Sequence, residues 1–384
     1  MSLTLLNHSY INNKYELFGF TEELSNNAFL PIRLENVDIA VANALRRIFM
    51  SEVPTFAFAE ENVKLFPVNV PSQYHRQVLI ERIGLITLDC NLLNIDDMIF
   101  SITDPVDPSK PLKNTTNGIL KIRLHEYLYI QESASKVQVP TKSVIPYNSL
   151  LLTLNPNEEV HVVMKATSGV GRQHTRWQSS ITMYKFETEF DSNPKIGHVE
   201  TNEEQALYKG HELKQPSAVI LTIESVGKLY SKTVVMRGID ILKEKLQIFR
   251  DLLIGQTSEA VSIEIDENIP NLVKLKIINE DHTLGHLLES SCLNRLKSLI
   301  KTTIGSDETE GLELLLESLV AYRKPHPLDN YIEFSVRTPQ KLSLTFPNGQ
   351  FDEIENPSIR LILLAVDDMQ ILCDKLTLDA KMIV

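Results

Sequence analysis

The first strong pattern of apolar and polar positions predicts a helix that begins just after Asp38. Asp is a favoured N-cap residue, because its carboxylate accepts a hydrogen bond from a backbone N–H in the first turn. Apolar side chains then recur at helical spacing; they are Val41, Leu45, Ile48 and Phe49. Asn43, Arg46 and Arg47 fall on the opposite face, and Pro54 ends the helix. The pattern therefore indicates one face for a core and one for polar contacts.

Short segments in which apolar and polar residues alternate fill the next part of the chain. Residues 55–65 predict a strand or hairpin, and residues 73–85 predict a helix with Leu79 and Ile83 on its inner face. From about residue 89 to residue 216 the runs are separated by Pro, Asn, Ser and Gly. This texture is typical of a mainly β unit.

Two long amphipathic helices are predicted. One covers residues 231–253, and the other follows Asn356 and Pro357, where Asn can cap the helix and Pro can occupy its first turn. Apolar residues spaced alternately by four and three indicate that each helix needs a partner helix. The residues expected to form this intramolecular contact are Val235, Ile239, Leu242, Leu246, Phe249, Ile362, Val366, Met369 and Leu372.

A diverged internal repeat connects the two parts of the chain. Residues 38–45 align without a gap with residues 281–288, and each segment opens on an acidic residue. In both copies the helix follows a strand and precedes a strand pair, and the order of elements carries more weight than the matching letters. Two such units, each ending in an amphipathic helix, can bury those helices against each other as a pseudo-symmetric body.

Composition restricts the classes of function. A length of 384 residues predicts two or three domains, and a hydrophobic fraction of 43% is that of a folded protein. A net charge of -12 disfavours general nucleic-acid binding but is compatible with docking onto large basic proteins. The three scattered cysteines predict an intracellular, reduced chain without a disulfide framework. No apolar stretch approaches the length of a membrane span, and no leader pattern is recognisable, so no membrane contact is expected.

Several ordered motifs give the chain a family resemblance. Residues 41–57 resemble the signature helix and strand of the α-like RNA polymerase subunits, which are the third nuclear subunit, its archaeal counterpart and the N-terminal domain of bacterial α. Residues 82–88, 169–177 and 222–227 fall in the order that this family shows. A second set resembles the smaller partner, which is the eleventh nuclear subunit or its archaeal counterpart; its two motifs are residues 279–285 and 320–328.

The resemblance implies an α+β fold in which two ferredoxin-like halves form an intramolecular pseudo-dimer. The first half is expected at residues 28–88 and 217–255, with a β-rich insertion domain at residues 89–216. The second half is expected at residues 259–384. The insertion lacks the cysteine cluster that binds zinc or an iron-sulfur cluster in some relatives, so no cofactor is expected.

By resemblance, the chain is a non-catalytic assembly scaffold of a multisubunit DNA-directed RNA polymerase. Its expected partners are the largest and second-largest subunits and a small zinc-binding subunit, without direct sequence-specific nucleic-acid contact. Large DNA viruses of eukaryotes encode similar fusions. The expected location is therefore a viral factory in the host cytoplasm and the virion, or otherwise the nucleus.

Five polar residues are candidates for the partner interface. Arg46 and Arg47 differ by about 100° around their helix, so they cannot both face the core. Arginine is also enriched at interfaces, where it can bind carboxylates through two parallel hydrogen bonds. The alternative is a salt bridge within the chain to Glu52 or Glu81. The full set of candidates is Asn43, Arg46, Arg47, Glu52 and Arg82.

Two rival functions remain open. His282 and His286 lie four residues apart on a predicted helix, a spacing that could place two imidazoles on one metal of a hydrolase. His282 is followed by Thr rather than by the Glu of a zinc-protease motif, so helix capping and packing are the alternative roles. The other rival is a free-standing assembly chaperone that leaves the finished enzyme.

Overall fold

The computed structural model has the α+β class expected from the sequence, with helices packed on several antiparallel sheets. One continuous hydrophobic core cluster includes residues from Leu30 to Ala380. The residues that the structure describes are 2–5, 29–66, 74–91, 95–104, 107, 110–133, 136–186, 218–255, 260–304, 308–342 and 354–383.

The first part of the chain forms a four-stranded sheet with the order β1-β2-β13-β12. Its strands are β1 (Ser2–Leu5), β2 (Phe29–Glu35), β12 (Ser180–Phe186) and β13 (Ala218–Ser225). Ile32 pairs in register with Leu221, and both side chains are buried on the same face. Helices α3 (Ile39–Ser51) and α9 (Ser231–Ile254) pack against this sheet.

The second part forms another four-stranded sheet, with the order β14-β15-β17-β16. Its strands are β14 (Val261–Ile265), β15 (Leu272–Ile278), β16 (Leu319–Arg323) and β17 (Tyr331–Arg337). Leu275 pairs with Phe334 on the buried face. The helices of this part are α10 (His282–Ile304), α11 (Glu308–Glu317) and α12 (Pro357–Ile383).

The two sheets are built in the same order. In each, an edge strand leads to a strand and a helix, and two antiparallel strands then lead to a long helix. The correspondence pairs β1, β2, α3, β12, β13 and α9 with β14, β15, α10, β16, β17 and α12. Between the first helix and the third strand, the first part carries the β-rich unit and the second part carries α11.

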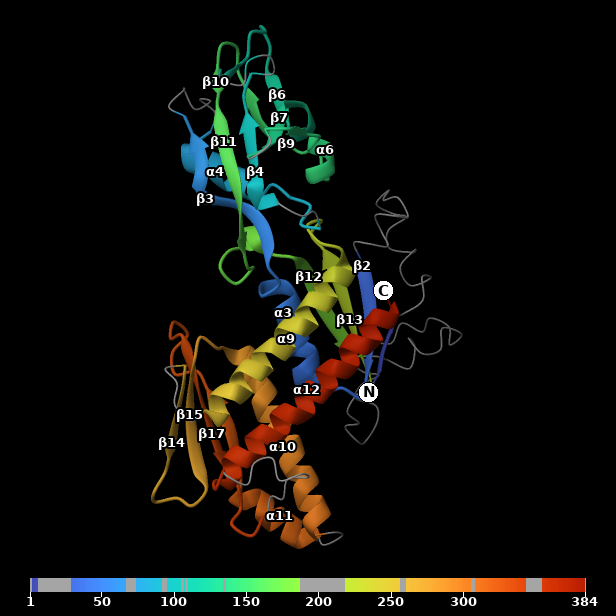
Figure 1. Ribbon diagram of the computed structural model, residues 1–384, viewed down its shortest axis with the longest axis vertical. Helices are drawn as coiled ribbons and strands as arrows, with labels where there is room; N and C mark the ends of the chain where they lie inside the picture. The colour runs from blue at the N-terminus through green and yellow to red at the C-terminus, as the bar shows by residue number, and fades with distance from the viewer. Residues whose placement is uncertain are drawn as a thin grey trace, which may run out of the picture.

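The β-rich unit lies at one end of the molecule (Figure 1). Its main sheet has the order β3-β11-β4-β7-β8, and the pairs β10-β5 and β6-β9 complete it. Phe58 and Phe100 meet edge to face in its core, with ring centroids 4.9 Å apart. Its elements are β3 (Thr55–Leu65), α4 (Arg76–Gly84), β4 (Met98–Ile102), β5 (Leu112–Lys113), β6 (Leu120–Arg123), α5 (Leu124–Tyr127), β7 (Leu128–Glu132), β8 (Gln138–Val139), α6 (Thr141–Val144), β9 (Leu150–Leu154), β10 (Glu159–Val160) and β11 (Val162–Gly169).

Strand pairing differs from the sequence-based ranges at two strands. Those ranges place β3 in the first half and β12 in the insertion, whereas β3 pairs with β11 and β12 pairs with β13. Alternation of apolar and polar residues identifies a strand but does not identify its neighbours in a sheet. The change in the pattern of apolar and polar residues near residue 89 therefore does not mark the boundary between the first sheet and the β-rich unit.

The long helices α9 and α12 cross at the middle of the molecule (Figure 1), where they pack against each other, as α3 does against α10. Lys243 pairs with Asp374, and Arg250 pairs with Asp367. Lys243 precedes Arg250 on α9, whereas their partners occur in the reverse order on α12. The contact joins the first and second parts of the chain into one body.

Candidate subunit interfaces

Helix α3 begins and ends as its sequence predicts. Asp38 Oδ1 accepts a hydrogen bond from the Ala40 amide at 2.7 Å, which caps the helix. At the other end, the Glu52 amide donates to Ile48 O at 2.9 Å. Leu45 and Phe49 lie on the fully buried face. The polar face is thereby left to Asn43, Arg46 and Arg47.

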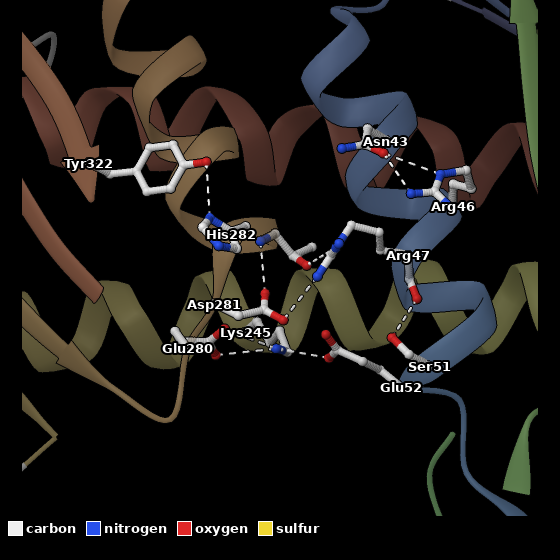
Figure 2. Close-up of polar contacts among 11 residues, drawn as sticks. Asn43, Arg46, Arg47, Ser51, Glu52, Lys245, Glu280, Asp281, His282 and Tyr322 are labelled. Atoms are coloured by element: carbon white, nitrogen blue, oxygen red, sulfur yellow. Dashed lines mark hydrogen bonds and ion pairs between the residues drawn. The ribbon is translucent and has the colours of Figure 1, made fainter. Parts of the chain in front are cut away.

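Asn43 and Arg46 form a pair on this polar face (Figure 2). Arg46 Nε and Nη2 both donate to Asn43 Oδ1, at 3.2 and 3.0 Å. Its Nη1 also lies 3.7 Å from Met50 Sδ. These contacts hold the guanidinium in one orientation, which lowers the entropy cost of binding a carboxylate partner.

Arg47 points in a different direction and reaches the start of α10. Its Nε donates to Thr283 Oγ1 at 2.7 Å, and its Nη2 lies 3.1 Å from Asp281 Oδ2. Burial alone would raise the pKa of Asp281, but hydrogen bonds from Thr283 and the charge of Arg47 outweigh it and lower that pKa. Arg47 therefore links the two parts of the chain.

Lys245 of α9 lies between two carboxylates in the same region (Figure 2). Its Nζ is 2.8 Å from Glu52 Oε2 and 3.2 Å from Glu280 Oε2. Burial raises the pKa of Glu280. Burial alone would lower the pKa of Lys245, but the two carboxylates outweigh that effect and raise it. Glu52, a sequence-based interface candidate, is thus engaged within the chain.

The acidic caps of α3 and α10 make reciprocal contacts. Asp281 caps α10 by accepting from the Thr283 amide at 2.8 Å, and it also binds Arg47 of α3. Asp38 caps α3 and accepts from Ser290 Oγ and Asn294 Nδ2 of α10, at 2.8 and 2.7 Å. Ser290 occupies the position in the repeat that Arg47 occupies in the first copy. Each cap residue therefore bonds both its own helix and the helix of the other part.

The nine apolar residues expected between the long helices are all buried, at 6% exposure or less. They lie on α9 and α12, which pack together. A Cβ on Gly238 of α9 would lie 2.2 Å from Phe49 Cδ1, so α9 approaches α3 as closely as a glycine allows. These helices form the central contact between the two parts.

Arg82 lies on α4 beside an exposed apolar patch. Its Nη2 donates to Leu150 O at 3.3 Å, and its guanidinium carbon is 5.4 Å from the centre of the Tyr74 ring. A cavity of about 230 Å³ adjoins it, lined in part by Leu85, Tyr147 and Leu150, all of which are exposed. Clustered exposed apolar side chains beside an arginine are typical of protein interfaces.

A buried arginine, which the apolar pattern did not reveal, lies at the junction between the β-rich unit and the segment that precedes α9. Arg176 Nη1 donates to Phe58 O at 2.9 Å, and its Nη2 lies 3.2 Å from Glu81 Oε2. Trp177 Nε1 donates to Thr167 O at 3.0 Å. The buried amine of Lys228 donates to Arg176 O, and burial lowers its pKa to about 8. The junction is therefore a packed polar core.

The histidine pair of α10 lies against Tyr322. His282 Nδ1 is 3.4 Å from Tyr322 Oη, and His286 Nδ1 is 3.2 Å from Glu289 Oε2. Across the described part of the chain, no group of three or more His, Cys, Asp or Glu side chains is placed to hold a metal ion. The contacts of both histidines are those of a packed helix face.

Comparisons with known proteins agree with this architecture. The family profile of the RNA polymerase Rpb3/Rpb11 dimerisation domain matches residues 32–246. The chain belongs to this family. As an α-like subunit, it is a structural, non-catalytic component of a DNA-directed RNA polymerase.

Individual relatives come from nuclear, archaeal and viral polymerases. The chain is 24% identical over 270 residues to DNA-directed RNA polymerase II subunit RPB3 of Schizosaccharomyces pombe, covering 61% of this chain and 88% of that protein. It is 28% identical over 263 residues to subunit Rpo3 of Pyrobaculum aerophilum, covering 60% and 94%. A protein of Acanthamoeba polyphaga mimivirus, named as a candidate DNA-directed RNA polymerase subunit, is 19% identical over 294 residues, covering 68% and 73%.

None of the described helices combines the length and apolar character that crossing a membrane requires.

Proposed function

We propose that this subunit is an assembly scaffold in which both halves of a dimerisation module are fused. One half contains the sheet β1-β2-β13-β12 with α3 and α9, and the other contains the sheet β14-β15-β17-β16 with α10 and α12. In this proposal the two are ferredoxin-like halves of a pseudo-dimer, interrupted by the β-rich unit. The reciprocal contacts of the Asp38 and Asp281 caps support it most directly. Fusion keeps the halves at high effective concentration.

The proposed partners are the two large catalytic subunits, with a small zinc-binding subunit nearby. Asn43 and Arg46 would face the second-largest subunit, because their side chains contact each other rather than the second half. The Arg82 patch would face another subunit. Similarity to a mimivirus protein supports a viral polymerase, for which we propose a location in the viral factory and the virion.

Arg46→Glu tests the α3 surface. A partner carboxylate that binds the Arg46 guanidinium would be repelled, so we expect about a tenfold or larger loss of the co-purifying second-largest subunit. Pull-down of the tagged chain with quantitative mass spectrometry measures this loss. Far-UV circular dichroism should be unchanged, since the hydrogen bonds of Arg46 in the described structure go to α3 residues.

Arg47→Glu is the matched comparison on the neighbouring residue. It places a carboxylate beside Asp281, so its expected first effect is on the stability of the contact between the halves. Unchanged recovery of the large subunit with Arg46→Glu would contradict the interface assignment. Recovery of this chain only in free form, and never with a polymerase at one copy per enzyme, would favour an assembly chaperone.

A further inference from the structure

The second part of the chain carries a helix that its sheet does not need. Helix α11 lies between α10 and β16, the position that the β-rich unit occupies between α3 and β12 in the first part. Helix α10 is also longer than α3, with 23 residues against 13. Both parts complete the same sheet order without an equivalent of α11. Helix α11 is therefore an elaboration, at the end of the molecule opposite the β-rich unit (Figure 1).

Helix α11 carries more apolar side chains than it buries against the rest of the described chain. Leu314 is buried, and Gly311 approaches Ile300 of α10, with its Cβ position 3.8 Å from Ile300 Cγ2. Leu312 and Leu316, one helical turn apart, are nevertheless 63% and 78% exposed. Leu319, at the start of β16, is 43% exposed. Leu312 and Leu316 therefore form an exposed apolar surface on α11, and Leu319 is a third exposed leucine in the same short segment.

Glutamates border this surface on one side. Glu313 and Glu317 are exposed and lie one turn apart, next to the leucines around the helix. A second copy of the chain would bring the same glutamates together in a symmetric contact, which like charges oppose. Anionic lipid or nucleic acid would be repelled in the same way. The complementary surface is an apolar groove bordered by Lys or Arg.

We propose that α11 docks into a groove of another protein, with an apolar floor for Leu312 and Leu316 and a basic border for Glu313 and Glu317. Helices that bind grooves use anchors at this i, i+4 spacing. The surface is separate from the Asn43–Arg46 pair and from the Arg82 patch. It adds a partner contact to the proposed scaffold and does not depend on that function.

Photo-crosslinking in the full chain tests this proposal. Leu312 is replaced by the photo-reactive p-benzoylphenylalanine, which keeps an apolar side chain, and the tagged chain is isolated from cells after irradiation. Mass spectrometry then locates the crosslinked peptide. We expect it to come from a different protein and to contain apolar residues flanked by Lys or Arg. Adding Leu316→Ser, or Glu313→Lys with Glu317→Lys, should lower the crosslink yield about tenfold.

Ile265→Ser is the matched control, because Ile265 is an exposed apolar residue on β14 of the same half. It should leave the yield unchanged. Crosslinks confined to this chain or to a second copy would overturn the proposal, as would an acidic target peptide or a yield insensitive to charge reversal. Since the tag is on this chain, the result is informative even if Arg46→Glu leaves polymerase association unchanged.

Discussion

Replacing Lys245 with methionine tests how strongly the charged cluster joins the first and second parts of the chain. Lys245 connects α9 to the end of α3 through Glu52 and to the turn before α10 through Glu280. Methionine keeps most of the side-chain volume but removes the ammonium. Both carboxylates would then remain largely buried without their shared cation.

The expected magnitude follows from partial burial. The side chains of Lys245, Glu52 and Glu280 are 21%, 12% and 17% exposed. Breaking a buried ion pair costs about 3–5 kcal/mol, whereas an exposed pair contributes about 0.2–1 kcal/mol. The cluster lies between these limits, so we expect the free energy of unfolding to fall by about 2–3 kcal/mol at pH 7.

The loss should depend on pH in one direction. Burial already raises the pKa of folded Glu280 above its ordinary value of 4.5, and removing Lys245 raises it further. A carboxyl with a raised folded pKa takes up its proton more readily in the folded state, so stability recovers as pH falls. The loss caused by Lys245→Met should therefore shrink between pH 7 and pH 5.

Urea unfolding followed by far-UV circular dichroism measures both effects. Lys243→Met is the control, since Lys243 lies on the same helix as Lys245 but its pair with Asp374 of α12 is exposed, and we expect a much smaller loss. Adding Glu280→Gln to Lys245→Met should restore part of the stability. Equal losses for the two lysines, or a Lys245→Met loss that does not change with pH, would refute the reasoning.

Two further substitutions test other contacts. Gly238→Ala places a Cβ against Phe49 and should destabilise the fold by about 1–3 kcal/mol in thermal unfolding. Gly118→Ala, which meets no atom within 4 Å, should have little effect, and equal effects would contradict the packing of α9 on α3. Lys228, with a folded pKa of about 8, binds fewer protons in the folded than in the unfolded state between pH 8 and its ordinary 10.5. Stability should therefore rise with pH in that window, by up to about 1.4 kcal/mol per unit, and Lys228→Met should abolish this rise. Identical pH slopes for Lys228→Met and the native chain would show that this amine is not buried.

Secondary structure was most predictable where one period dominates. Strand β3 has the bounds predicted for residues 55–65, and the final helix begins at Pro357. Helix α11 was missed, because its leucines form a short block that fits a strand as well as a helix. Strand β14 was also missed, because its five residues are too short a segment to show one period clearly.

Long-range polar pairing was the least predictable part of the site. Residue spacing correctly indicates that Arg46 and Arg47 point in different directions. Neither Glu52 nor Glu81 is the partner of these arginines, because Glu52 binds Lys245 and Glu81 binds Arg176. Local spacing determines the direction of a side chain on its own helix, but a partner from another segment depends on the tertiary fold.

The crossing of α9 and α12 also affects how the protein is synthesised. Helix α9 leaves the ribosome well before residues 357–383, so the part of its apolar stripe that packs on α12 stays uncovered while the second part of the chain is being translated. Nascent chains with such uncovered stripes are prone to aggregate and are typical clients of chaperones. Shielding by the translation machinery would then be needed until α12 emerges, which makes the order of synthesis part of how this subunit acquires its structure.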